Sequence, residues 1–109
     1  MVETTGFAVV LVTASGLEEG NKITSTILDK RMAACVNIVP KISSLFWWQG
    51  KIDAADEVLL IIKTRASRVD DIIAVVKSIH SYSVPEVIAL PIMAGHGGYL
   101  DWIAEEVGE

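Results

Sequence analysis

Two stretches of the chain are apolar at nearly every position. Residues 7–13 read FAVVLVT, and residues 58–62 read VLLII. Successive side chains of a strand point to opposite faces, so a strand that is apolar throughout is covered on both faces. Both stretches are therefore predicted to be central strands of a sheet.

Other stretches space their apolar residues three and four positions apart, which is typical of a helix with one buried side. The first is predicted to run from Leu17 to Arg31, with Ser15 and Glu18 forming a capping box at its start. Gly20 lies inside this helix and is expected to cost about 1 kcal/mol relative to alanine.

A second helix is predicted after a capping motif at residues 67–70, and it ends near His80. After the glycine-rich loop at residues 95–98, a short C-terminal helix is indicated by the apolar spacing of residues 99–107.

Proline marks the two remaining strands. Residues 33–48 form a long strand that bends at Pro40, and the strand after Val84-Pro85 contains Pro91. Proline removes a backbone donor, so it is tolerated in a sheet mainly on edge strands. These two strands are predicted to be the edges.

The predicted order is strand, helix, strand, strand, helix, strand and a last helix. Right-handed crossovers place the first and third strands in the middle of the sheet. The sequence therefore predicts an α+β fold, the ferredoxin-like βαββαβ sandwich with an extra C-terminal helix. Both crossover helices lie on one face, so we expect other subunits to cover the other.

The composition fits a single domain over residues 1–109. The chain is 51% hydrophobic, but its apolar runs are shorter than the roughly 20 residues of a membrane-spanning helix, so we expect no membrane partner. A net charge of -5 without a basic stripe argues against nucleic-acid binding. One cysteine and no signal-peptide pattern at the N-terminus predict a cytoplasmic protein.

The sequence contains none of the familiar metal, phosphate-binding or hydrolytic motifs, so we expect no enzyme. Cys35 lies in an apolar strand, where packing is the more common role of a thiol than metal ligation. His80 ends a helix, where an imidazolium interacts well with the helix dipole.

Two features of the predicted hairpin bear on partners. Asp53, Asp56 and Glu57 form an acidic cluster that we interpret as a solvated turn. Trp47 and Trp48 are adjacent in one strand and point to opposite faces, so at least one of them is available to a partner or ligand.

The chain resembles the CutA family of divalent-ion tolerance proteins over nearly its whole length. The resemblance is carried by RMAACVNIVP (31–40), SLFWWQGKI (44–52), EVLLIIKT (57–64), HSYSVPEVIALPI (80–92) and YLDWI (99–103). It implies a homotrimer of ferredoxin-like subunits, similar to the PII signalling proteins, with the three sheets facing inward. It also implies divalent-metal binding or tolerance, with copper as the family's usual label.

Some bacterial members of that family assign copper to a cysteine late in the first strand and to a His-His pair ending the second helix. The matching positions here are Val12 and Ile79-His80, and Ser81 and Ser83 replace the family's common proline and glutamate. A lone imidazole is a poor divalent site, because selective sites use three or four ligands. His80 and Cys35 are therefore the candidate ligands for copper or zinc, with further ligands from Glu86, water or a neighbouring subunit.

A cleft between subunits is the other candidate site. We expect the loop from Tyr82 to Glu86 to meet the hairpin end at Trp48, with Lys63 nearby, because loops carry sites on rigid scaffolds. The alternative function is a PII-like small-molecule or protein-signalling trimer without a metal.

Overall fold

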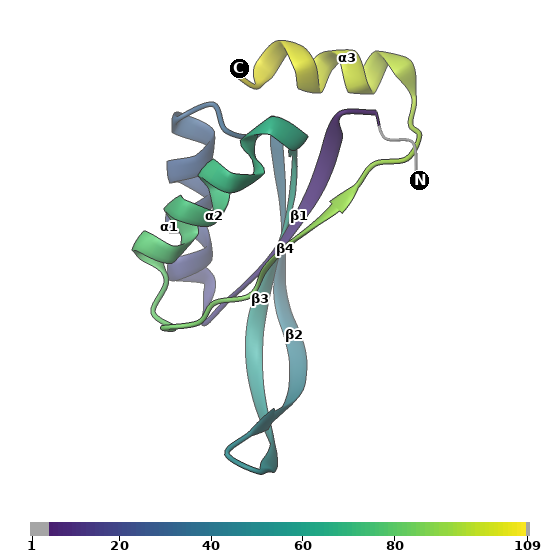
Figure 1. The fold of residues 1–109 in the computed structure, drawn as a ribbon. Coiled ribbons are helices and arrows are strands. Elements are labelled where there is room, and N and C mark those ends of the chain that lie inside the picture. The colour runs from purple at the N-terminus through teal and green to yellow at the C-terminus, as the bar shows by residue number, and fades with distance from the viewer. Residues whose placement is uncertain (1–4, 109) are drawn as a thin grey trace.

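The computed structural model describes residues 5–108, which form a four-stranded sheet and three helices (Figure 1). Met1 to Thr4, which entered the signal-peptide expectation, lie outside this range. The elements are β1 (Phe7–Ala14), α1 (Leu17–Asp29), β2 (Cys35–Trp48), β3 (Lys51–Arg65), a 3-10 turn (Ala66–Arg68), α2 (Val69–Ile79), β4 (Val87–Pro91) and α3 (Gly97–Glu106).

The sheet has the order β2-β3-β1-β4, and every neighbouring pair is antiparallel. The two strands that are apolar on both faces therefore lie in the middle, and the two strands that contain proline lie at the edges. The predicted ferredoxin-like topology is confirmed. The register places Val9 opposite both Lys63 and Leu90, and Lys63 lies opposite Cys35.

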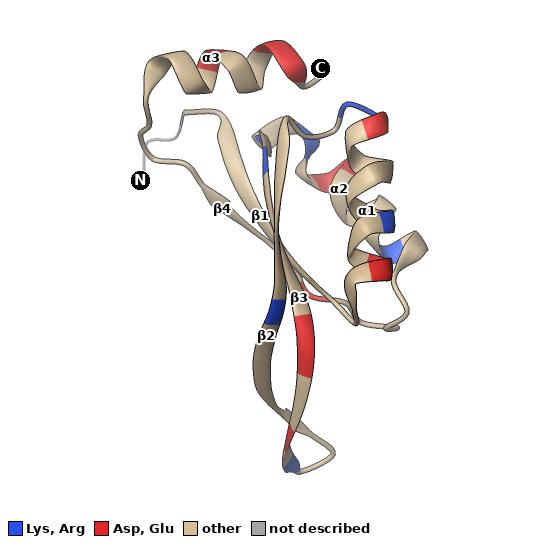
Figure 2. Cartoon of the chain, turned by 180° about the vertical axis from the view of Figure 1, so that it is seen from behind, with Lys and Arg blue, Asp and Glu red and all other residues tan. Residues whose placement is uncertain are grey.

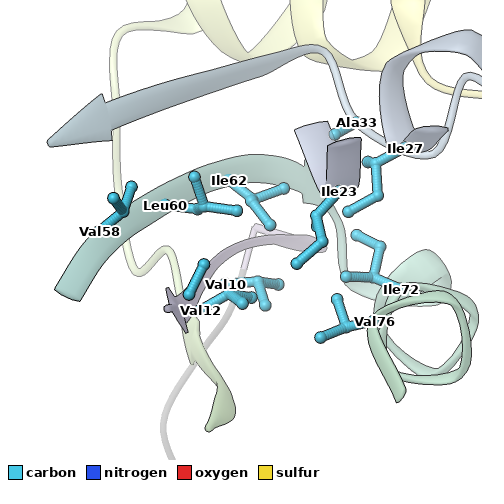
Figure 3. Packing of buried hydrophobic residues seen from close by; sticks show 11 residues of the cluster. Val10, Val12, Ile23, Ile27, Ala33, Val58, Leu60, Ile62, Ile72 and Val76 are labelled. Carbon is cyan, nitrogen blue, oxygen red and sulfur yellow. The ribbon is translucent and has the colours of Figure 1, made fainter. Parts of the chain in front are cut away.

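The core lies between α1, α2 and one face of the sheet (Figure 3). Gly20 of α1 is part of the reason that this helix packs closely. A Cβ atom added at Gly20 would lie 3.2 Å from Cγ1 of Val58 on β3. The fully buried side chains of this core include Val10, Val12, Ile23, Ile27, Leu60, Ile62, Ile72 and Val76.

Among the described elements, α3 covers the other face of the sheet, and it does so at one end (Figure 1). Ile103 of α3 is fully buried. The carboxyl end of α3 is held by two guanidinium groups: Arg65 donates to the backbone oxygen of Ala104, and Arg31 donates to that of Glu106. Beyond α3 this face carries half-buried and exposed apolar side chains, and we call it the open face.

β2 and β3 form a long hairpin that projects beyond the rest of the sheet (Figure 1). The pairing shifts between Val39 and Ile42, so the bend predicted at Pro40 is confirmed as an irregularity in the ladder. Gln49 and Gly50 close the hairpin with φ values of 51° and 78°. Two positive φ values are typical of the two-residue turn whose twist matches that of paired strands.

The helix starts differ from the predicted caps. Gly16 is the N-cap of α1 and no side chain caps it, so the predicted pairing of Ser15 with Glu18 is wrong. Glu19 instead accepts a hydrogen bond from the Ser15 backbone. The cap predicted at residues 67–70 is also wrong, because a 3-10 turn leads into α2. α1 ends at Asp29, two residues early, since Arg31 adopts a φ of 55°.

Charged residues of both signs alternate along α1 and on the hairpin (Figure 2). The first turn of α1 carries Glu18 and Glu19, and Lys22 follows one turn later. Within the part of the chain that the structure describes, no helix is long and apolar enough to cross a membrane.

Candidate functional site

The loop that follows α2 brings together side chains from three distant parts of the chain. α2 ends at Ile79, and His80 is already extended, with φ -62° and ψ 140°. The helix therefore ends six residues before Pro85, and its last turn is closed by a 2.8 Å bond from the His80 N–H to the carbonyl oxygen of Val76.

The imidazole of His80 lies in the interior, with its side chain fully shielded from solvent. Its Nε2 atom is 2.7 Å from the carbonyl oxygen of Thr13, at the end of β1. Its Nδ1 atom accepts the backbone N–H of Tyr82 at 3.0 Å. The ring therefore connects the central strand to the loop after α2, which differs from the predicted interaction of an imidazolium with the helix dipole.

Glu19, on the first turn of α1, is the acidic partner of this cluster. Its Oε2 accepts the Ser81 N–H at 2.9 Å, and its Oε1 accepts the Ser15 N–H at 3.1 Å and lies 3.4 Å from Nε2 of His80. Burial raises the pKa of the Glu19 carboxyl, but the hydrogen bonds from Ser81 and Ser15 outweigh it and lower the pKa overall. Glu19 is therefore a carboxylate at neutral pH.

Tyr82 extends the cluster to β3. Its ring lies against that of His80, with centroids 4.7 Å apart, and its hydroxyl donates to Oε2 of Glu57 at 3.1 Å. Burial raises the pKa of Tyr82, and the bond to Glu57 raises it further. Glu57 is 8% exposed, so the expectation that it belongs to a solvated turn is wrong. Asp53 and Asp56, its companions in that expectation, are exposed.

Cys35 lies elsewhere, on the open face. It is half-buried and pairs with Lys63, so the two side chains share one face of the sheet. The Tyr99 hydroxyl of α3 lies beside the thiol, and burial together with this neighbour raises the pKa of Tyr99. Thiol, amine and phenol thus form a small polar group on the open face.

The two candidate metal ligands are not brought together within one chain. Cys35 pairs with Lys63 of β3, and Lys63 pairs with Val9 of β1. His80 instead contacts Thr13, four residues after Val9 on β1. Four residues of a strand span about 13 Å. Across the described residues, no three His, Cys, Asp or Glu side chains are grouped closely enough to hold a metal ion.

The cleft residues are also spread along one chain. The Tyr82 hydroxyl contacts Glu57 of β3. Trp48 pairs with Lys51, six residues before Glu57 on that strand, and Lys63 lies six residues after Glu57. Six strand residues span about 20 Å, so a second chain is needed to bring Trp48 to either group. Glu86 is exposed and directly precedes β4, four residues after Tyr82. Trp47 and Trp48 are 73% and 59% exposed, which confirms that at least one tryptophan is available to a partner.

Sequence reasoning missed Glu19 as a site residue. Glu19 accepts hydrogen bonds from Ser15, 4 residues away in the sequence, and from Ser81, 62 residues away, which the fold brings near. The available signal in the sequence was Glu19, a second glutamate in the first turn of α1. In the fold, the amino end of α1 meets the carboxyl end of α2. The hydrophobic pattern does not show that these ends meet.

The strand order, with two helices on one face, defines a ferredoxin-like α+β sandwich, and the long hairpin and third helix are additions to it. Residues 8–106 match the family model described as "CutA1 divalent ion tolerance protein". The chain belongs to this family. The name of the family describes tolerance of divalent ions and not a catalysed reaction.

Individual relatives agree with this membership. The chain is 48% identical over 101 residues to Protein CutA 1, chloroplastic, of Oryza sativa subsp. japonica, a match that covers 93% of this chain and 57% of the rice protein. It is 47% identical over 98 residues to the divalent-cation tolerance protein CutA of Archaeoglobus fulgidus, covering 90% of this chain and 95% of the relative.

The fold agrees as well. The crystal structure of CutA1 from Oryza sativa superposes with a TM-score of 0.93 at 47% identity, covering 97% of each chain.

Proposed function

We propose that this chain acts in divalent-cation tolerance as a homotrimer, whose subunits bury the open face and the end of the long hairpin against one another. One observation carries the proposal. The hairpin end exposes a cluster of large apolar side chains: Leu45 (72%), Trp47 (73%), Trp48 (59%) and Ile52 (64%). Soluble monomers rarely expose apolar surface of this kind, so it marks an interface.

The open face supports the same assembly. Ile88 and Leu90 of β4 are 51% and 50% exposed, and the register places them beside Leu11 and Val9 of β1. Within residues 5–108, the edge strands β2 and β4 each have one side without a partner strand in the sheet. Unpaired strand edges accept another chain readily, so a neighbouring subunit can both cover the apolar face and extend the sheet.

In this assembly the hairpin of one subunit reaches a neighbour, and Trp48 meets Lys63, Tyr82 or Glu86 of that neighbour in a shared cleft. Within one chain, Trp48 is about 20 Å or more from Tyr82 and from Lys63. A projecting hairpin has the length to cross onto the next subunit.

Copper or zinc would be held in the assembly and not by one chain. Cys35 supplies a thiolate, a ligand that suits soft and borderline ions, and Glu86 supplies an exposed carboxylate. Neither belongs to a group of three His, Cys, Asp or Glu ligands among residues 5–108, so the remaining donors come from a neighbouring subunit or water. His80, the other candidate, has both ring nitrogens engaged within its own chain.

The test is a calorimetric titration with Zn(II) at neutral pH on three proteins: the parent, Cys35→Ser, and a hairpin variant carrying Leu45→Glu and Trp47→Glu. Lys22→Gln, an exposed polar change on α1, away from the hairpin and the open face, is the control. The parent and the control should be trimers that bind Zn(II), and the other two should bind at least about tenfold more weakly. Equal Zn(II) binding by a monomeric hairpin variant would contradict the proposal.

A PII-like trimer that binds a small molecule and no metal is the second candidate. It is favoured by the absence of a three-ligand group among the described residues, and by the aromatic and charged composition of the proposed cleft. A thermal-shift screen of metabolites, run beside the Zn(II) titration, separates the two. We further propose a cytoplasmic location, which rests only on the sequence.

A further inference from the structure

We infer that His80 in this chain is a neutral structural bridge that positions the loop after α2, and that it is not a divalent-metal ligand. Every contact in this inference lies within one chain, so it does not depend on the proposed trimer. It also goes against what the family resemblance implies for this position.

The hydrogen bonds determine which ring nitrogen carries the proton. A backbone N–H is always a donor, so Nδ1, 3.0 Å from the Tyr82 nitrogen, must be the acceptor and carries no hydrogen. A backbone carbonyl is always an acceptor, so Nε2 must carry the hydrogen and donate it to Thr13 at 2.7 Å. The imidazole is thus neutral, in the tautomer with hydrogen on Nε2.

This arrangement leaves no lone pair for a metal. Imidazole binds a metal through an unprotonated ring nitrogen, and the only unprotonated nitrogen of His80 already accepts the Tyr82 N–H. The other nitrogen is protonated and shielded from solvent. A metal ion that took His80 would have to break the bond to Tyr82 or the bond to Thr13, and would release the loop in either case.

Among the described residues, the nearest potential second ligand of His80 is already engaged by other groups. The residue before His80 is Ile79, and the residue before Thr13 on β1 is Val12. Both side chains are apolar. Glu19 is near, but its two oxygens already accept backbone hydrogen bonds from Ser15 and Ser81. The nearest carboxylate is therefore used to hold the same loop.

His80 thus acts as a positioning residue. It joins the end of β1 to the loop, and Glu19 joins the first turn of α1 to the same loop through Ser81. With the backbone fixed at residues 81 and 82, the Tyr82 side chain reaches Glu57 of β3 at 3.1 Å. The cluster therefore determines where the loop that leads to β4 lies.

The chain provides its own control in His96. This histidine is the N-cap of α3, where its Nδ1 accepts the Tyr99 N–H at 3.2 Å. It is exposed, and its Nε2 has no partner among residues 5–108. His96 therefore offers the open imidazole nitrogen that His80 lacks, and a loosely bound ion should go to His96 first.

The experiment is a Zn(II) titration of the full-length protein at pH 7.5, followed by imidazole ¹⁵N NMR. In the metal-free protein, His80 should show a protonated Nε2 and an unprotonated Nδ1. Added Zn(II) should leave the His80 signals unchanged and shift those of His96. A His80 ring that is metallated, or that shows the opposite tautomer, would overturn the inference.

Variants give a second readout. His80→Ala should leave Zn(II) affinity within about twofold of the parent while amide hydrogen exchange over residues 81–86 becomes faster. His80→Asn offers an acceptor near the position of Nδ1 and should restore part of that protection. Zn(II) affinity that falls about tenfold or more in His80→Ala, but not in His96→Ala, would contradict the inference. If a His80 variant does not fold, the NMR titration of the parent still decides.

Discussion

Replacing Glu19 with glutamine should destabilise the chain and change how its stability depends on pH. The parent carboxylate accepts two backbone hydrogen bonds, one from Ser15 and one from Ser81. Glutamine keeps one acceptor oxygen and turns an amide NH₂ toward the other backbone N–H. A hydrogen bond to a charged group contributes about 1.5–3 kcal/mol. Ser15 and Ser81 are exposed, so water can take up a released N–H, and the loss should be about 1.5 kcal/mol at pH 7.

The pH dependence follows from the lowered pKa of Glu19. Its ordinary value is 4.5, and the folded chain lowers it. A group whose pKa is lower in the folded state contributes stability that is present above the unfolded value and is lost as the pH falls through the folded value. The difference between the parent and Glu19→Gln should therefore stay constant above pH 5 or so and shrink below 4.5.

The assay is urea denaturation at one fixed protein concentration, because the stability of an oligomer depends on concentration. Glu18→Gln is the matched control: it removes a charge from the same helix turn, is exposed, and has no hydrogen-bond partner among the described residues. It should change the free energy of unfolding by less than about 0.5 kcal/mol. Equal effects of the two substitutions at pH 7, or a Glu19→Gln effect that does not shrink in acid, would refute the reasoning.

Two further predictions concern Tyr82 and α3. The Tyr82 hydroxyl should titrate above its ordinary pKa of 10.0, and Glu57→Gln should lower that pKa, as followed by ¹³C NMR of the ring; an unchanged pKa would rule out the Glu57 contact. Ile103→Ala should cost about 2–5 kcal/mol in chemical denaturation, because it empties a fully buried site under α3, whereas exposed Asp101→Ala should cost little. A similar small cost for both would mean that α3 does not pack on the sheet as described.

Strand order could be predicted from the sequence because each strand carries its own signal. β1 and β3 are apolar on both faces, and Pro40 and Pro91 fall in the strands that end up at the edges. Such information is local, so it can be read without knowing which segments meet. The bend in β2 was predictable for the same reason.

The cluster around His80 could not be predicted in this way. Its contacts join His80 to Thr13 and Ser81 to Glu19, pairs separated by 67 and 62 residues. A histidine at a helix end has several roles, and only the distant carbonyl and the nearby N–H show that this ring is neutral. Glu57 was misread because its acidic neighbours on the hairpin are exposed, while a tyrosine from another segment covers it.

The central claim is that the exposed hairpin end and the open face are buried between subunits. Light scattering on the purified protein at micromolar concentration tests it most directly. The account predicts a single species of three times 11.8 kDa that remains trimeric on dilution until it unfolds. A folded, monodisperse monomer of 11.8 kDa would contradict it.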